Sequence, residues 1–276
     1  MSALEIPDPA DFAFACAVRS LGDGTLTADL RPEWSIGGHP HGGFLIALLA
    51  KAGLTVLTER GEPSVDPLAV SAQFLRAPAI GPVLLRTDLR KVGRQATVVS
   101  VRLEQRGRSC VEASVTAGRL PGRRPEWADL PSMPAEPPPR SIPVGGETAE
   151  GTFHLAKGCD VRLDPATAGY LSGRIGDPPR MRLWVKPRRS VPDPYFALLA
   201  GDINPPVVFN LGRSGWSPTV QLTALVRARP APGWLRVYVD CRSVQEAWFD
   251  SDATVIDSTG RLVCQARQLA LAPASA

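Results

Sequence analysis

Apolar and polar residues alternate along several short runs of this sequence. Three such runs follow one another in the first half, at 83–90, 99–104 and 111–115. A period of two is typical of a β-strand with one buried face, and Gly93 and Gly107 fall between the runs, where antiparallel strands need short turns. The second half shows the pattern again at 235–240 and in a final run at 262–271. Each half is therefore predicted to form an antiparallel meander.

One helix is predicted ahead of each meander. Residues 42–57 are apolar nearly all round, as expected of a helix that other structure encloses. Residues 193–200 begin with an aspartate followed by a proline, which is typical of a helix N-cap and first turn. A long central helix wrapped by a curved antiparallel sheet, repeated twice along the chain, is an α+β fold of the tandem (double) hotdog type.

The two halves also share landmarks at a fixed spacing. Pro78 and Pro230 are 152 residues apart, as are Gly81 and Gly233. Between the halves the sequence becomes rich in proline and loses any period, which indicates an extended linker. We therefore expect an N-terminal hotdog repeat at 1–119, a proline-rich linker at 120–148 and a C-terminal hotdog repeat at 149–276.

Gln268 stands out on the final strand because it is polar in an apolar phase of the alternation. It lies in phase with Ala266, on the less polar side of the run. Gly107 and Gly260 are 153 residues apart, and the same spacing places Gln268 at the position of Val115. Burying an unpaired amide costs roughly 1–3 kcal/mol on mutational scales. A partner is therefore expected, either in an active site or in a hydrogen bond that only stabilises the core.

The order and spacing of several motifs resemble those of the type II acyl-CoA thioesterases, whose single chain holds two hotdog repeats. In the first half these motifs are Trp34, the glycine- and histidine-rich stretch at 37–44, and Phe-Leu-Arg-Ala-Pro at 74–78. In the second half they are the segments at 200–206, 217–219 and 257–268. The resemblance covers most of the chain and implies hydrolysis of a fatty acyl-CoA thioester by an activated water, without a cofactor.

The resemblance also implies a set of site residues. In that family an aspartate, a threonine or serine, and a glutamine hold the attacking water, and Asp202, Thr219 and Gln268 are the matching positions here. Backbone amides at the start of the first helix, near Gly42 and Gly43, are thought to polarise the thioester carbonyl. We therefore expect a catalytic set from the second half and a substrate-binding set from the first.

The chemistry of these residues leaves alternatives open. Asp202 could take a proton from water, or it could only cap a helix end or a turn. Thr219 follows a proline at the start of a strand, where a structural role is the simpler interpretation. Gly42 and Gly43 suit an oxyanion hole, because amides at a helix N-terminus are unpaired and lie at the positive end of the dipole, but they also suit a tight turn into the helix. His41 is a candidate substrate contact.

No metal site is predicted, because His39 and His41 lie in a glycine-rich loop without a third ligand candidate nearby. Guanidinium groups pair well with phosphates, so arginines could meet coenzyme A or could simply be solvated on the surface. The arginine pairs considered for this contact are Arg123, Arg124, Arg188 and Arg189.

Composition narrows the class of protein further. A formal net charge of +4 over 276 residues gives no case for nucleic-acid binding, although it helps to attract an anionic substrate. Five scattered cysteines without a CxxC pair favour a reducing, cytoplasmic location. The apolar stretch at 42–57 is interrupted by Lys51 and is shorter than a membrane span, so no membrane insertion is predicted. Association of the double unit into a homo-oligomer stays open.

Two rival functions remain on the same fold. The first is a non-catalytic protein that binds or senses acyl-CoA, because a fold does not fix a function. The second is an enoyl-CoA hydratase or dehydratase, which would be expected to place an Asp–His pair at the site. Neither His41 nor His154 has an aspartate at a recognisable spacing, which argues against this second rival. The sequence also lacks the GxSxG, P-loop, HExxH and GxGxxG motifs of other enzymes.

Overall fold

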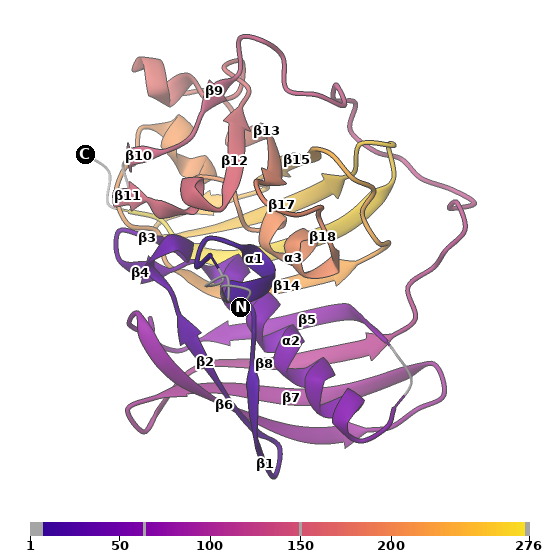
Figure 1. Ribbon diagram of the computed structural model, residues 1–276. Helices are drawn as coiled ribbons and strands as arrows, with labels where there is room; N and C mark the ends of the chain where they lie inside the picture. The colour runs from indigo at the N-terminus through magenta and orange to yellow at the C-terminus, as the bar shows by residue number, and fades with distance from the viewer. Residues whose placement is uncertain (1–7, 63–64, 149–150, 274–276) are drawn as a thin grey trace, which may run out of the picture.

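The computed structural model describes residues 8–62, 65–148 and 151–273, and it has the predicted double hotdog architecture (Figure 1). The first half contains a long helix and the strands around it: β1 (Arg19–Gly22), β2 (Thr25–Leu30), α2 (Gly42–Glu59), β5 (Asp66–Phe74), β6 (Gly81–Lys91), β7 (Ala96–Gln105) and β8 (Arg108–Gly118). The second half repeats this order around a shorter helix: β12 (Cys159–Leu163), β13 (Arg180–Pro187), α3 (Pro194–Ala200), β14 (Thr219–Val226), β15 (Leu235–Asp240), β17 (Trp248–Ile256) and β18 (Leu262–Leu271).

Smaller elements complete the chain. They are α1 (Phe12–Ala15), β3 (Ser35–Ile36), β4 (His39–Pro40), β9 (Ile142–Pro143), β10 (Gly146–Thr148), β11 (Gly151–Phe153), β16 (Val244–Gln245) and the 3-10 helices η1 (Pro32–Trp34), η2 (His154–Lys157), η3 (Gly169–Ser172) and η4 (Val207–Leu211). The short strands β10, β11, β3 and β4 form a separate small sheet, in which β11 of the second half pairs with β3 of the first.

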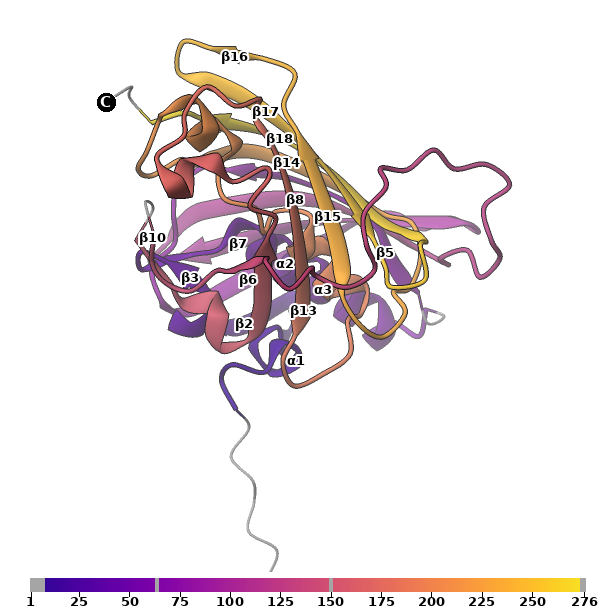
Figure 2. The same cartoon turned by 90° about the horizontal axis from the view of Figure 1, so that it is seen from above.

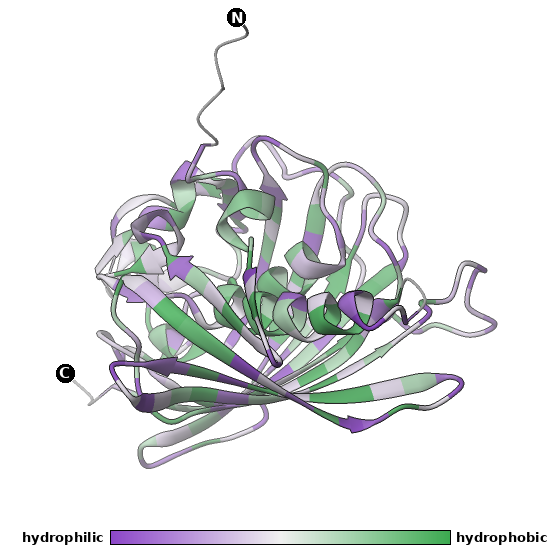
Figure 3. Ribbon diagram, turned by 60° about the horizontal axis from the view of Figure 1, so that its bottom comes forward, coloured by the Kyte–Doolittle hydropathy of each residue, from purple (hydrophilic) through white to green (hydrophobic). Residues whose placement is uncertain are grey.

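One large antiparallel sheet runs through both halves in the order β1-β2-β6-β7-β8-β5-β14-β18-β17-β15-β13-β12-β9. The two half-sheets join where β5 pairs with β14, at the centre of Figure 1. Both α2 and α3 lie on the same side of this sheet, and Figure 3 shows apolar residues along the helices and along the strands beneath them. The core of each half is therefore closed by a helix that the sheet curves around.

The seam between the half-sheets coincides with the symmetry of the sequence. Ser71 of β5 pairs in register with Thr223 of β14, and the two residues are 152 positions apart, which is the spacing of the repeat landmarks. Their hydroxyl oxygens are 2.8 Å apart and share a hydrogen bond. Equivalent residues can face each other in this way only at a pseudo-two-fold axis, so the axis passes between Ser71 and Thr223.

The predicted helices and strands are found in the structure, which also contains strands that the patterns did not predict. β15 and β18 have the predicted limits, and α3 begins as expected, with the Asp193 carboxylate accepting a hydrogen bond of 2.7 Å from the Phe196 amide. β5 is absent from the predicted pattern, because its alanine and serine positions give little hydropathy contrast. α2 continues to Glu59, two residues beyond the expected end.

Burial, rather than length, identifies α2 as a core helix. At 18 residues α2 is, within the described ranges, the one helix whose length and hydropathy would allow a membrane span, but 72% of it is buried inside the protein. All five cysteines are described, and none of them forms a disulfide.

Residues 119–141 contain neither helix nor strand, and Figure 2 shows part of this segment looping outward. The segment is nevertheless fastened to the second half: the Trp184 indole donates to the Pro134 carbonyl over 2.8 Å, and the Arg236 guanidinium donates to the Met133 carbonyl over 3.0 Å. Residues 119–141, called the strap below, are therefore docked on the second half of the chain. The limits of the two repeats stay a prediction.

Glycine at position 43 is expected to be required by the close contact of the two helices. A Cβ atom at Gly43 would lie 2.8 Å from the Leu199 carbonyl oxygen, whereas one at Gly53 would make ordinary contacts of 3.4–3.6 Å with Val101 and Val115. Gly43→Ala should therefore lower the free energy of unfolding by about 1–3 kcal/mol, as overpacking does. Gly53→Ala, in the same helix, should leave it unchanged or raise it by up to about 1 kcal/mol. Urea unfolding of both variants tests the contact, and equal effects would contradict it.

Candidate active site

A pocket of about 330 Å³ lies where the first turn of α2 meets the second half of the chain. Residues from both halves line it, among them His41, Gly42, Leu45, Phe74, Asp202, Asn204, Trp216, Thr219 and Gln268. Its volume is at the lower end of the range for small-molecule sites, and its wall combines apolar side chains with a few polar ones, as binding sites typically do. Both halves of the chain therefore contribute to the pocket.

Asp202 reaches this pocket because α3 ends early. The helix stops at Ala200, and the Asp202 amide is fixed by a 3.1 Å hydrogen bond to the Leu199 carbonyl. The side chain then lies against the start of α2: a Cβ atom at Gly42 would be 2.7 Å from Asp202 Oδ2. Gly42 thus allows a close approach that any other residue would block. The alternative that Asp202 belongs to a helix end also holds in part, because the carboxylate faces the N-terminus of α2.

Burial controls the ionisation of Asp202. The residue is 8% exposed, and loss of solvation raises the pKa of its carboxyl from 3.8 to about 7. The backbone amide of Gly43 acts in the opposite direction by favouring the charged form. A carboxyl group with this pKa exchanges protons near neutral pH, which is what a general base requires.

His41 is the N-cap residue of α2, but its side chain makes no hydrogen bond to the helix. Instead, its Nε2 lies 3.0 Å from the backbone carbonyl oxygen of Asp202. A carbonyl only accepts, so Nε2 carries the proton and Nδ1 is an acceptor. Nδ1 is buried and has no partner among the described protein atoms. The ring therefore fixes the backbone of Asp202 and offers an acceptor inside the pocket.

The contact between His41 and Asp202 is not an ion pair at neutral pH. His41 Nε2 lies 3.9 Å from Asp202 Oδ2, within the range of an ion pair. Burial, however, lowers the pKa of His41 to about 4, despite the opposing hydrogen bond to the Asp202 carbonyl. The imidazole is thus neutral over the pH range in which the carboxyl titrates.

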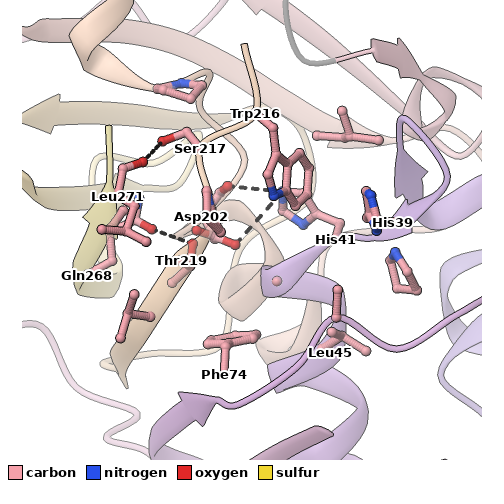
Figure 4. A pocket seen from close by; sticks show the side chains of 18 of the residues that line it. His39, His41, Leu45, Phe74, Asp202, Trp216, Ser217, Thr219, Gln268 and Leu271 are labelled. Carbon is pink, nitrogen blue, oxygen red and sulfur yellow. Dashed lines mark hydrogen bonds and ion pairs between the residues drawn. The ribbon is translucent and has the colours of Figure 1, made fainter. Parts of the chain in front are cut away.

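Thr219 and Gln268 form the other polar wall of the pocket. Thr219 is the first residue of β14, as predicted, and its hydroxyl donates a hydrogen bond of 2.8 Å to Gln268 Oε1 on β18. Figure 4 shows Asp202 between His41 on one side and Thr219 and Gln268 on the other. With Oε1 engaged by threonine, the amide nitrogen of Gln268 is left as a donor. The structure thus brings the three predicted residues together around one space.

The sheet register shows that Gln268 and Val115 occupy equivalent positions in the two halves. Gln268 pairs with Leu222 and Ser251, just as Val115 pairs with Val70 and Val99 in the first half. The predicted equivalence of Gln268 and Val115 is therefore confirmed by both neighbouring strands. Ser251 is 3% exposed, which places a buried polar residue beside the half-buried Gln268 where the first half has a valine.

Several pocket residues were beyond the reach of the sequence patterns. Asn204, two residues after Asp202, has a buried Oδ1 without a partner among the described protein atoms. Trp216 is 43% exposed, and its ring centroid lies 4.6 Å from that of His39 with the two rings tilted by 40°, so one ring from each half meets at the pocket. Phe74 lies under the start of α2, 3.5 Å from where a Cβ atom of Gly42 would be. The pairing of Trp216 with His39 could not be foreseen, because the two lie in different halves.

One expectation of the sequence analysis is wrong. His41 does have an aspartate beside it, because the fold brings Asp202 to it from 161 residues away, and a search by local spacing misses such a pair. His154 lies in η2 and does not line the pocket. The argument against a hydratase that rests on a missing Asp–His pair therefore fails.

The arginines singled out from the sequence lie elsewhere. Arg188 pairs with Asp160 and Arg189 with Asp8, each at 2.7 Å, and neither lines the pocket. Arg123 and Arg124 are exposed on the strap and are not pocket residues either. A phosphate contact near the pocket has to come from other residues.

Comparison with known proteins agrees with this architecture. Residues 30–118 match the acyl-CoA thioesterase N-terminal domain, and residues 128–272 match the acyl-CoA thioesterase C-terminal domain. The chain belongs to the acyl-CoA thioesterase family. An uncharacterised protein of Mycobacterium tuberculosis is 44% identical over 264 residues, which are 89% of this chain and 90% of the relative.

Solved structures place this thioesterase-family chain among hotdog proteins. A protein from Thermobifida fusca, provisionally named a thioesterase II, superposes with a TM-score of 0.84 at 30% identity over 95% of this chain and 97% of its own. A hotdog protein of unknown function from Alicyclobacillus acidocaldarius gives a TM-score of 0.79 at 20% identity over 96% and 98%. The second likeness concerns the fold alone.

The buried carboxyl group of Asp202 is expected to lower the free energy of unfolding at neutral and alkaline pH. Below about pH 4 its carboxyl is protonated in both states, but between pH 4 and 7 the unfolded chain releases the proton while the folded chain keeps it. Rising pH therefore favours unfolding, by about 4 kcal/mol above pH 7 for a shift from 3.8 to about 7. Asp202→Asn should be more stable than wild type at pH 8 and equal to it near pH 4, as measured by urea unfolding.

Asp252→Asn is the matched control for this measurement. Asp252 pairs with Arg267 on the surface, so its loss should cost about 0–1 kcal/mol and give no gain at high pH. An Asp202→Asn protein less stable than wild type at pH 8 would show that the carboxylate is a structural cap.

Proposed function

We propose that this chain hydrolyses the thioester of a fatty acyl-CoA to the free acid and coenzyme A, using a water held by Asp202, Thr219 and Gln268. The observation that carries this proposal is a buried carboxyl group with a pKa of about 7 at the start of α2, facing the Thr219–Gln268 pair. Membership of the acyl-CoA thioesterase family supports the same class of reaction. No cofactor is needed, because a thioester carbonyl is already electrophilic.

The water is held by complementary hydrogen bonds. The ionised Asp202 accepts a hydrogen bond from the water, and the Gln268 amide nitrogen donates a hydrogen bond to the water oxygen while Thr219 fixes the glutamine. The water oxygen attacks the thioester carbon, and Asp202 takes the released proton. Collapse of the intermediate breaks the C–S bond, and the leaving thiolate takes that proton from Asp202. Asp202 is thereby ionised again, and no second acid is needed.

The negative charge on the former carbonyl oxygen needs a donor. The start of α2 supplies unpaired amides at the positive end of its dipole. Gly42 lines the pocket and is assigned this role, whereas Gly43 does not line it and its amide favours the charged form of Asp202. His41, 7% exposed, positions the Asp202 backbone rather than transferring protons. The unpartnered acceptors His41 Nδ1 and Asn204 Oδ1 suit the amide N–H groups of the pantetheine arm or a bound water.

Removing the base or the glutamine should abolish most of the activity. For Asp202→Asn we expect a fall in kcat of about 10²- to 10⁴-fold, which is the usual contribution of a general base. Gln268→Ala and Thr219→Val should each lower kcat about tenfold or more through lost hydrogen bonds, while Thr219→Ser retains the hydroxyl. Release of free thiol from acyl-CoAs of several chain lengths measures these effects.

Gln265→Ala is the matched control for Gln268→Ala, because Gln265 lies on the same strand but is exposed on the opposite face. It should retain wild-type activity. If wild type released thiol from none of the substrates and acyl-CoA stayed bound for hours, a non-catalytic binding protein would be supported instead. Full activity of both Asp202→Asn and Gln268→Ala would refute the assignment of residues.

The activity should depend on pH through Asp202. Because the base must be ionised, kcat/KM should fall about tenfold per pH unit below a midpoint near pH 7 and reach a plateau above it. His41, with a pKa of about 4, does not titrate in this range. The remaining activity of Asp202→Asn should lack this inflection, and a wild-type profile that stays flat down to pH 5 would contradict the role of Asp202.

A hydratase or dehydratase is the second candidate, because His41 and Asp202 lie within 3.9 Å of each other. Two features make it the weaker one: the His41 N–H is engaged by the Asp202 carbonyl, and this chemistry gives no role to the Thr219–Gln268 pair. Enoyl-CoA decides between them. Loss of the conjugated absorbance without release of thiol would favour the hydratase, and release of thiol alone would favour hydrolysis.

A further inference from the structure

Three arginines border a second hollow next to the pocket. Arg76 follows β5, and Arg106 and Arg108 flank the turn between β7 and β8. Arg76 and its neighbour Ala77 line both the pocket and the hollow, so the two spaces adjoin. All three arginine side chains belong to exposed residues, and the hollow therefore leads from the pocket towards solvent past a concentration of positive charge.

The charge of these arginines is not neutralised by the protein. No carboxylate of the described chain lies within ion-pair distance of Arg76, Arg106 or Arg108. In contrast, the arginines on the adjacent strands β6 and β7 each have an acidic partner: Arg86 with Glu104, Arg90 with Asp88, and Arg102 with Glu104 and Glu112. The hollow is thus an unpaired positive site beside a surface of paired charges.

The hollow is also held in shape. The Gln105 side chain accepts from the Ala79 amide at 2.8 Å and donates to the Ala79 carbonyl at 2.9 Å, which ties the loop after β5 to the end of β7. Arg76 donates to the Ser109 carbonyl at 2.9 Å across the neighbouring strand. The three guanidinium groups are therefore mounted on two connected strand ends.

Arg106 occupies a backbone conformation that normally selects other residues. Its φ of 52° is left-handed, as is that of Gly107 at 74°, and a two-residue turn of this kind favours asparagine, aspartate or glycine. Arginine at such a position costs local stability, and a residue held there against preference points to a role of its side chain.

The symmetric position in the second half has lost this property. The repeat spacing places Ala228 where Arg76 stands, and Arg261 where Arg108 stands. The Arg261 guanidinium donates to the carbonyls of Pro121 and Arg123 on the strap, and Arg261 lines neither the pocket nor the hollow. The second half therefore offers no counterpart of Arg76 and Arg108 beside the pocket.

The separation from the pocket suits a long polar arm. Phe74 lies against Gly42, and Arg76 stands two residues further along the chain, roughly 7 Å at strand spacing. Arg108 stands three residues from Val111, the partner of Phe74 in the sheet, which is roughly 10 Å. A pantetheine arm has as many backbone atoms as about four extended residues and spans roughly 14 Å. A thioester at Asp202 would thus place the phosphates of its carrier near these arginines.

We infer that Arg76, Arg106 and Arg108 bind the phosphate groups at the nucleotide end of coenzyme A, and that they select coenzyme A thioesters over thioesters without the nucleotide. Guanidinium groups pair with phosphate oxygens through charge-assisted hydrogen bonds, often two at a time. This inference rests on the proposed hydrolysis for its substrate, but the binding of the nucleotide can be measured without turnover.

The test compares an acyl-CoA with the acyl-pantetheine of the same acyl group. The variant is Arg106→Asn with Arg108→Gln, in which asparagine keeps the left-handed turn. We expect the ratio of kcat/KM for acyl-CoA to that for acyl-pantetheine to fall at least tenfold, through KM. Binding of 3′,5′-ADP, measured by titration calorimetry, should weaken by a similar factor. Arg90→Gln, which removes an exposed arginine paired with Asp88, should leave both measurements at wild-type values.

Three outcomes would overturn the inference. The ratio and the 3′,5′-ADP affinity could both stay within twofold of wild type. Both substrates could lose activity equally while 3′,5′-ADP affinity is unchanged, which would indicate a structural role. Hydrolysis of an acyl-carrier-protein thioester could be impaired while that of acyl-CoA is not, which would make the hollow a protein contact. If wild type hydrolyses no thioester, the proposed function fails. The phosphate site would still be supported if wild type bound 3′,5′-ADP and the double variant did not.

Discussion

The pairing of β5 with β14 is the contact on which the rest of the molecule depends. It turns two half-sheets into one, and the hydrogen bond between Ser71 and Thr223 marks its centre. Through this seam the start of α2 is brought against the end of α3, so that Gly42 of the first half faces Asp202 of the second. Neither half contains both groups. A chain cut between the repeats would have to rebuild the same seam before any pocket existed.

The seam imposes a conflict between stability and function at Asp202. A carboxyl group at 8% exposure loses most of its hydration, and the first turn of α2 returns only part of that loss through its amides. The glycines at 42 and 43 add to the cost, because glycine is a poor helix former. Yet the same burial raises the pKa to about 7, where a carboxylate can exchange protons with water at neutral pH. Burial of Asp202 therefore lowers the stability of the fold and also gives its carboxyl group the pKa that a general base needs.

Sequence patterns carried the fold further than the site. The N-cap of α3, the extent of β15 and β18, and the equivalence of Gln268 with Val115 all followed from local periodicity and spacing, because each depends on a few neighbouring residues. The candidate triad came from a resemblance, and only the phase of Gln268 supported it independently. The meeting of His41 with Asp202 and the cluster around Arg76 were out of reach, since they depend on how strands far apart in sequence come together. The local spacing of residues in a single sequence does not predict such contacts.

The pseudo-two-fold symmetry would allow the candidate site to occur twice per chain, but the residues at the second position differ from those at the first. The repeat spacing relates Gly42 to Pro194, because α2 and α3 begin at these residues. Proline has no N–H, so the second helix lacks the amide that would face an oxyanion. The same spacing of 152 residues relates Asp202 to Ala50 and Thr219 to Pro67, and the spacing of 153 found further along the chain relates Gln268 to Val115. None of these three counterparts has a side chain that can hold or activate a water. α2 continues through Ala50 as a buried helix where α3 has ended. Because α3 ends early, the Asp202 carboxylate can reach the pocket. At the symmetry-related position α2 continues, and its buried helix occupies the equivalent space.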